Sequence, residues 1–84
     1  MDGVPVVSAV DEKRVGRVIR TEGRYYIVRR SFGRGCYPLP MREAKVDSEG
    51  PRVLMNLPRR TLFAAPKAPR REGLDPATDL YYSG

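Results

Sequence analysis

Arginine residues gather in one short part of this sequence, from Lys13 to Arg34, and aromatic residues stand among them. Eight basic residues and one acid, Glu22, give this segment a net charge of +7, which exceeds the +6 of the whole chain. Guanidinium groups bind phosphate and carboxylate groups, and aromatic rings stack on exposed nucleic-acid bases. The chemistry open to this segment is therefore the binding of a polyanion or an acidic protein surface. The candidate binding residues are Arg20, Arg24, Arg29, Arg30 and Arg34, interleaved with Tyr25 and Phe32.

Catalytic and metal-binding chemistry has little support in this sequence. The chain has no histidine and a single cysteine, Cys36, so it lacks a Cys/His zinc site, a histidine general base and an intramolecular disulfide. The loop around Gly33 and Gly35 lacks the Gly-Lys-Ser/Thr ending of a phosphate-binding loop. We therefore expect no enzymatic activity, no catalytic residue, no metal, no cofactor and no small-molecule substrate.

The arginines lie on a predicted β-hairpin whose arms are Val15–Thr21 and Arg24–Arg30. The second arm places an apolar pair on each of its faces, and one of these pairs is Tyr25 with Ile27. Because a strand of this kind has both faces covered, we expect another segment or a second subunit over that pair. A homodimer is the simplest arrangement, with Tyr25, Ile27 and Phe32 at its contact.

Further strand and turn signals surround this hairpin. Gly16, in its first arm, marks a position where a side chain would crowd a neighbouring backbone or where the strand bends. Other strands are predicted at Val4–Val10, Cys36–Pro40, Lys45–Asp47 and Arg52–Leu57. A helical turn is predicted at Met41–Ala44, and another after Pro58, where Leu62 and Phe63 would cover an open end of the sheet. Strands therefore dominate the predicted structure.

The chain divides into two parts in this prediction. Residues 1–65 form an all-β fold, a small antiparallel barrel of five or six strands with a short helical turn, and residues 66–84 form an extended tail rich in proline and charge. A disordered tail is one alternative. However, Asp75 followed by proline is typical of a helix start, and Leu80 and Tyr81 follow it. We therefore expect the tail to pack on its own barrel or on a neighbouring subunit, with Leu80 and Tyr81 as anchors.

Four sequence pieces, in this order, carry a resemblance to a known family. They are Val15-Gly16-Arg17-Val18, Tyr25-Tyr26-Ile27-Val28, Tyr37-Pro38-Leu39-Pro40 and Arg52-Val53-Leu54-Met55. The pattern resembles the PRC-barrel superfamily of small β-barrels, and within it the short stand-alone bacterial members. The resemblance leaves the tail unexplained. It implies a non-enzymatic module that binds other macromolecules, and it brings no catalytic residues with it.

Charge and composition leave two functions open. The arginines of the hairpin can simply keep the outer face of a small barrel in solution. Beyond that, we expect an adaptor module that binds another protein through an acidic surface; the alternative is RNA or single-stranded nucleic acid bound through the arginine-rich hairpin 13–34. The N-terminal apolar run is short and interrupted by Pro5 and Ser8, so we expect neither a signal peptide nor a membrane span, and a cytoplasmic location.

Overall fold

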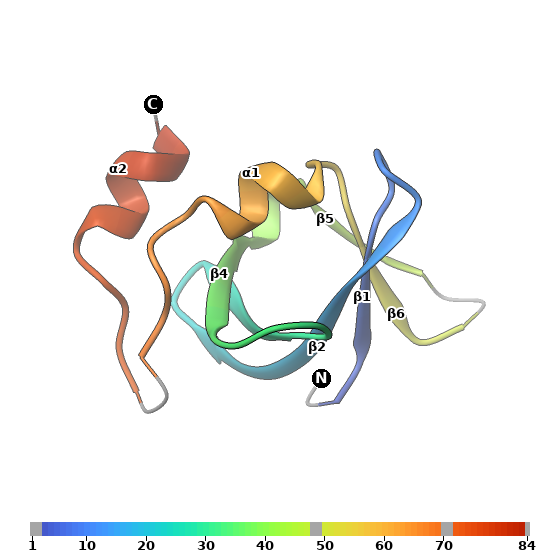
Figure 1. Cartoon of the computed structure of the whole chain (residues 1–84), viewed down its shortest axis with the longest axis horizontal. Coiled ribbons are helices and arrows are strands. Elements are labelled where there is room, and N and C mark those ends of the chain that lie inside the picture. The colour runs from blue at the N-terminus through green and yellow to red at the C-terminus, as the bar shows by residue number, and fades with distance from the viewer. Residues whose placement is uncertain (1–2, 48–49, 70–71, 84) are drawn as a thin grey trace.

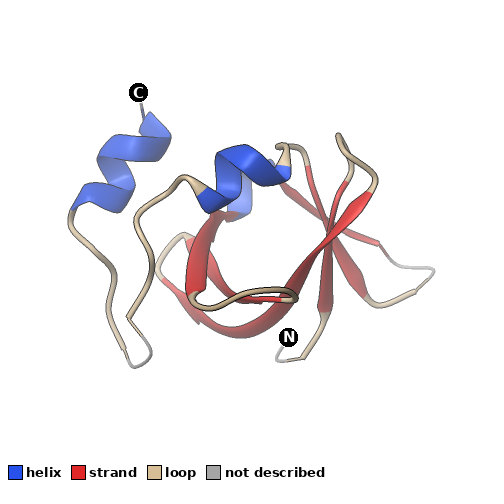
Figure 2. Ribbon diagram, in the orientation of Figure 1, coloured by secondary structure: helices blue, strands red, loops and turns tan. Residues whose placement is uncertain are grey.

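A computed structural model describes residues 3–47, 50–69 and 72–83 and shows a small, strongly curved sheet with two short helices (Figure 1). Figure 2 shows how strands make up the first part of the chain and helices the last. The elements are β1 (Pro5–Ser8), β2 (Lys13–Glu22), β3 (Tyr25–Arg30), β4 (Cys36–Pro40), the 3-10 turn η1 (Met41–Glu43), β5 (Ala44–Asp47), β6 (Arg52–Met55), α1 (Arg59–Phe63) and α2 (Ala77–Ser83). The predicted strands and helical turns are present, with small shifts at their ends.

The strands form one six-stranded sheet in the order β4-β3-β2-β1-β6-β5. Neighbouring strands are antiparallel except β1 and β6, which run parallel. The prediction of a purely antiparallel sheet is therefore wrong. The parallel pair places Val6 opposite Val53 and Ser8 opposite Met55, and all four residues are fully buried. This pairing builds the centre of the core.

The two edge strands, β4 and β5, are not paired with each other in the described residues, so the predicted closed barrel is not confirmed. Helix α1 lies across the open side between these strands (Figure 1). Its Leu62 is fully buried in the main core, and its Phe63 packs on Tyr37 of β4 with the ring centroids 5.1 Å apart. Side chains of the helix thus cover the core where strand pairing is missing, as predicted for the turn after Pro58.

Strand β2 bends at two β-bulges, which give the sheet its curvature. Val15 is the extra residue in the pairing with β1, and Ile19 is the extra residue in the pairing with β3. Between them, Gly16 lies so close to β3 that a Cβ atom would be 1.9 Å from the carbonyl oxygen of Arg29. The predicted close approach of the backbone at Gly16 is confirmed.

The chain's own tail covers the outer face of the β2–β3 hairpin near its turn. Tyr25 and Ile27 pack there against Ala68, with partial cover from Leu74 and Tyr82. Ile27 is 0% exposed and Tyr25 only 7%. The predicted contact of Tyr25 and Ile27 with a second subunit is therefore wrong, because the tail already occupies that face.

An ion pair on the hairpin holds the backbone of the tail. Arg20 pairs with Glu22 at 3.2 Å and donates a hydrogen bond to the carbonyl of Pro69 at 2.8 Å. Glu22 in turn accepts a hydrogen bond from the N–H of Gly73 at 3.1 Å. Both charged groups thus satisfy backbone groups of the tail, which would otherwise have no fixed partner as the tail crosses the sheet.

Helix α2 begins as predicted but presents a different face. The carboxylate of Asp75 accepts a hydrogen bond from the backbone N–H two residues later, at 2.8 Å. Thr78 is buried, and Tyr82 contacts the outer apolar cluster, whereas Leu80 is 76% exposed. Tyr81 is half-buried. The tail therefore packs on its own sheet as predicted, but the choice of Leu80 as an anchor is wrong.

Three tyrosine hydroxyl groups attach α2 to the rest of the molecule. That of Tyr81 donates to the carbonyl of Thr61, in α1, at 2.5 Å. The hydroxyl of Tyr25 donates to the carboxylate of Asp79 at 2.5 Å, and that of Tyr82 donates to the carbonyl of Pro38 at 2.6 Å. Burial raises the pKa of Tyr25 above its ordinary value, and the hydrogen bond to Asp79 raises it further. Burial also raises the pKa of Tyr82. The contacts of Tyr25 and Tyr82 therefore require the neutral form of the tyrosine.

Candidate functional site

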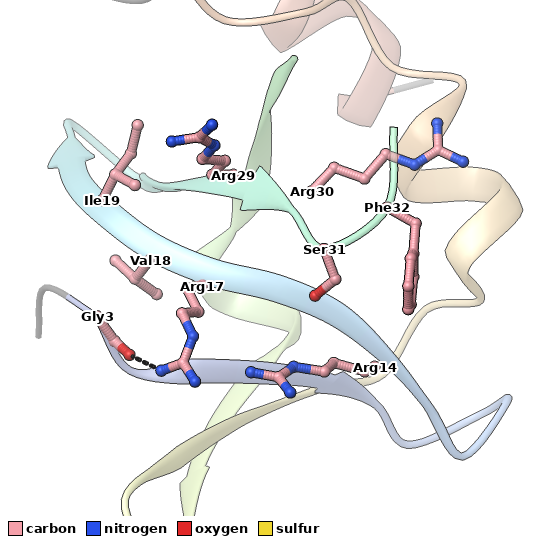
Figure 3. Close-up of a pocket in the computed structure, with 9 residues that line it drawn as sticks. All are labelled: Gly3, Arg14, Arg17, Val18, Ile19, Arg29, Arg30, Ser31 and Phe32. Carbon is pink, nitrogen blue, oxygen red and sulfur yellow. Dashed lines mark hydrogen bonds between the residues drawn. The ribbon is translucent and has the colours of Figure 1, made fainter. Parts of the chain in front are cut away.

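An open groove of about 630 Å³ lies at the other end of the hairpin, away from the tail. Figure 3 shows the residues around it: arginines from β2 and β3 and the ring of Phe32 from the loop after β3. We call this surface the basic groove. Its lining residues are Gly3, Arg14, Arg17, Val18, Ile19, Arg29, Arg30, Ser31 and Phe32. Four of these nine described residues are arginine and none of the nine is acidic, so this lining has a positive field.

Arg17 and Arg29 lie directly opposite each other in the register of β2 and β3. Both side chains extend from the outer face, because the neighbouring Val18 and Val28 are buried in the main core. Like charges at directly opposed positions of antiparallel strands repel each other and weaken the pairing. Two positive charges therefore lie on one face of the hairpin, although Figure 3 shows their side chains extending in different directions.

Arg14 and Arg17 come from the same strand and line the same groove. The guanidinium of Arg17 donates a hydrogen bond to the carbonyl of Gly3 at 2.8 Å, which fixes its position (Figure 3). The backbone carbonyl of Arg14 accepts a hydrogen bond from Arg59 at 3.1 Å, while its own side chain remains exposed. Within the described residues, the side chains of Arg14 and Arg29 have no hydrogen bond or ion pair. Their charges are therefore open to a ligand.

Arg30 is oriented differently from the other arginines. Its guanidinium lies over the ring of Phe63 in α1, 4.2 Å from the ring centroid. A cation over an aromatic face is attracted by the ring and holds its position. Arg30 therefore lines the end of the groove but is partly engaged by the protein itself.

The loop after β3 presents Phe32 to solvent. Ser31 donates a backbone hydrogen bond to Val15 at 3.1 Å, which extends the strand pairing up to the loop. The loop closes through a hydrogen bond from the N–H of Arg30 to the carbonyl of Gly35, a residue whose φ of 106° favours glycine. Phe32 lies within this closed loop and is 75% exposed. An apolar ring is thus held beside the arginines, and it stacks on no other ring or guanidinium of the described residues.

The structure separates the five arginines that were predicted to act together. Arg29 and Arg30 line the basic groove, but Arg20, Arg24 and Arg34 do not. Arg20 holds the tail, Arg24 is exposed at the turn end of the hairpin, and Arg34 is exposed in the loop beside Phe32. The five arginines therefore do not line one groove, and their role in binding stays a prediction.

Arg14 and Arg17 belong to the groove and were missed in the sequence. Both lie inside the basic segment from Lys13, but the prediction favoured arginines near the aromatic residues. The alternation of the first arm already placed Arg17 on the polar face of the strand. A choice based on strand faces would have selected it.

Comparison of the chain with protein-family models, with curated proteins and with solved structures finds no match. The described residues include no helix long and apolar enough to cross a membrane. In the same part of the chain, no group of three or more His, Cys, Asp or Glu side chains is arranged to hold a metal ion.

Proposed function

We propose that this protein is a non-enzymatic module that binds an anionic macromolecule in the basic groove. The observation that carries this proposal is the opposed pair of Arg17 and Arg29, in a groove with no acidic residue among the described residues that line it. Like charges at directly opposed strand positions weaken the pairing, whereas a bound anion would gain charge-assisted contacts with both. The exposed side chain of Arg14 adds to the same field.

Two partner classes fit this field. An acidic segment of another protein would make the molecule an adaptor, the role that its resemblance to PRC-barrel proteins implies. The curved sheet with α1 across its open side would then be a PRC-barrel-like scaffold. RNA or single-stranded nucleic acid is the second candidate, and the exposure of Phe32 beside the arginines favours it.

A double substitution in the groove tests the proposal. We expect the protein to bind both heparin and a poly-glutamate peptide weakly, and Arg17→Ala combined with Arg29→Ala to abolish most of this binding. The matched control is Arg24→Ala combined with Lys45→Ala, which removes the same charge from exposed residues outside the groove. Equal losses in both variants would show that only net charge matters and would overturn the proposed site.

A cytoplasmic location and a homodimer remain predictions within this proposal. Of the predicted interface residues, Phe32 and Leu80 are mostly exposed and lie on different parts of the chain. A dimer contact through Leu80 on α2 would leave the basic groove open. Sedimentation at micromolar concentration tests it, since Leu80→Ser would shift such a dimer to the 9.5 kDa monomer.

A further inference from the structure

We propose that the ligand of the basic groove is a single-stranded nucleic acid, with phosphates at Arg17 and Arg29 and one base stacked on Phe32. The proposal rests on the anion-binding function above and names the ligand class of that same site. Three features separate this ligand from an acidic peptide and from a duplex: the exposed ring, the type of cation and the shape of the groove.

The exposed ring is the first feature. Phe32 is 75% exposed and lines the groove together with the arginines (Figure 3). Every nucleobase offers a flat face to such a ring, and stacking of this kind tolerates any sequence. A carboxylate-rich peptide satisfies arginines but offers no flat apolar face to an isolated ring. The pairing of phosphate-binding and base-stacking groups in one groove therefore favours a nucleic acid.

The cations of the groove are the second feature. All four are arginine, whose planar fork binds two oxygen atoms of a phosphate and also stacks on bases. The hydrogen bond from Arg17 to Gly3 and the contact of Arg30 with Phe63 hold two of these groups before any ligand arrives. Groups that are already positioned lose less entropy when the ligand binds.

The shape of the groove is the third feature. A volume of about 630 Å³ suits a short stretch of flexible strand. Ile19 is half-buried in this lining and gives the groove an apolar wall beside the arginines. In a duplex the base faces are stacked inside the helix, so contact of Phe32 with a base face would require unstacking, which a single strand does not need. The groove is therefore expected to discriminate against double-stranded nucleic acid.

Fluorescence anisotropy with a labelled oligothymidylate of about ten nucleotides, a length typical of small single-strand-binding domains, tests the proposal. We expect Phe32→Ala to weaken binding about tenfold and Phe32→Trp to retain it, because stacking depends on the ring. We expect Arg29→Ala to lower the slope of log affinity against log salt by about 0.7, the value for one phosphate contact of a single strand. Arg24→Ala, on the same hairpin but outside the groove, is the matched control and should leave the slope nearly unchanged.

The outcomes separate this inference from the proposed function. If a duplex of the same length binds as tightly as the single strand, or if Phe32→Ala binds like the wild type, the inference is wrong. If poly-glutamate binds more tightly than the oligonucleotide and depends on Arg17 and Arg29, the anion-binding function stands and the ligand is an acidic protein segment. If neither probe binds at low salt, both proposals fail. Phe32 and Arg29 have exposed side chains, so their substitution should not unfold the protein. Circular dichroism of each variant checks this.

Discussion

The outer face of the β2–β3 hairpin has two halves that share the same strands but differ in what covers them. Near the turn, Tyr25 and Ile27 are apolar and lie under the tail. At the other end, Arg17 and Arg29 oppose each other and line an open groove. The tail therefore covers the apolar part of the outer face of the hairpin and leaves the basic part uncovered. One half is buried under the tail, and the other is open to solvent and is the half that we propose binds a ligand.

Arg20 lies at the boundary between the two halves and belongs to the first. Its ion pair with Glu22 and its hydrogen bond to Pro69 fix the tail near the turn. The arginines of the hairpin therefore differ in their contacts: Arg20 binds groups of the protein itself, whereas Arg29 is exposed to solvent. Ile19 is shared, since it lines the groove and also packs against the covered cluster. Changes at other positions of one half should leave the other intact, and this can be tested.

The largest expected effect on stability comes from a substitution at Gly16, where strands β2 and β3 approach each other closely. In Gly16→Ala the new Cβ would be 1.9 Å from the carbonyl oxygen of Arg29, so β2 and β3 must separate. We expect a loss of roughly 3 kcal/mol in the free energy of unfolding, the upper end for overpacking. Urea denaturation measures it. Gly50→Ala is the control, because a Cβ there meets open space; an equal effect of both substitutions would contradict the close approach.

Removal of the tail should affect the covered half alone. Deletion of residues 74–84 removes the partial cover of Tyr25 and Ile27 by Leu74 and Tyr82 and leaves their contact with Ala68. We expect a loss of about 2 kcal/mol, comparable to the burial of one large side chain, and a melting temperature lower by roughly 10 °C. Scanning calorimetry measures the shift, and sedimentation detects association through the uncovered face.

The truncated protein also tests whether binding in the basic groove depends on the tail. Its affinity for a polyanion should equal that of the intact chain, because none of the tail residues that the structure describes lines the basic groove. Unchanged melting would show that the tail contributes nothing to the fold. A loss of binding would show that the two halves are not independent.

Alkaline pH should release the tail through its tyrosines. The pKa values of Tyr25 and Tyr82 are raised in the folded protein above the ordinary value of 10.0. A raised folded-state pKa means that this stabilisation is complete below pH 10.0 and is lost as the pH rises through the folded-state values. Spectrophotometric titration of phenolate absorbance, with proteolysis of the tail as a second measurement, follows the release. In Tyr25→Phe combined with Tyr82→Phe the release should disappear; its persistence would contradict the assignment.

The smallest expected effect is a gain in stability. Arg29→Gln removes the repulsion with Arg17 across the strands and keeps a polar side chain on the exposed face. We expect the melting temperature to rise slightly while polyanion binding weakens. Arg24→Gln, whose side chain has no opposed arginine, should leave the melting temperature unchanged. A decrease in melting temperature for Arg29→Gln would show that Arg29 stabilises the fold instead.

Much of the strand content could be predicted from the sequence, because alternation and turn residues are local signals. The direction of β6 beside β1 could not, since the pattern within one strand does not record the direction of its neighbour. The pairing of Arg17 with Arg29 could not be predicted either, because it depends on a β-bulge in the neighbouring part of the strand. Without a bulge, counting back from the turn would pair Arg17 with Arg30, and the extra residue Ile19 shifts this pairing by one.

Helix α2 in the tail is a second element that the sequence predicted only in part. The sequence identified its start at Asp75 but not the face that contacts the sheet. Thr78 and Tyr82 are four residues apart and share one face, whereas Leu80 lies between them on the opposite face. The prediction chose Leu80 as an anchor because its side chain is apolar, but its position on the helix leaves that side chain exposed to solvent.

The central claim, that the basic half of the hairpin binds an anion while the tail keeps the other half covered, is tested most directly by nuclear magnetic resonance. Amide signals of the intact protein are followed during titration with a short polyanion such as oligothymidylate. We predict shifts at Arg17, Arg29 and the loop carrying Phe32, and none in α2 (Ala77–Ser83). Shifts centred on α2, or a uniform weak change over the whole surface, would contradict the account.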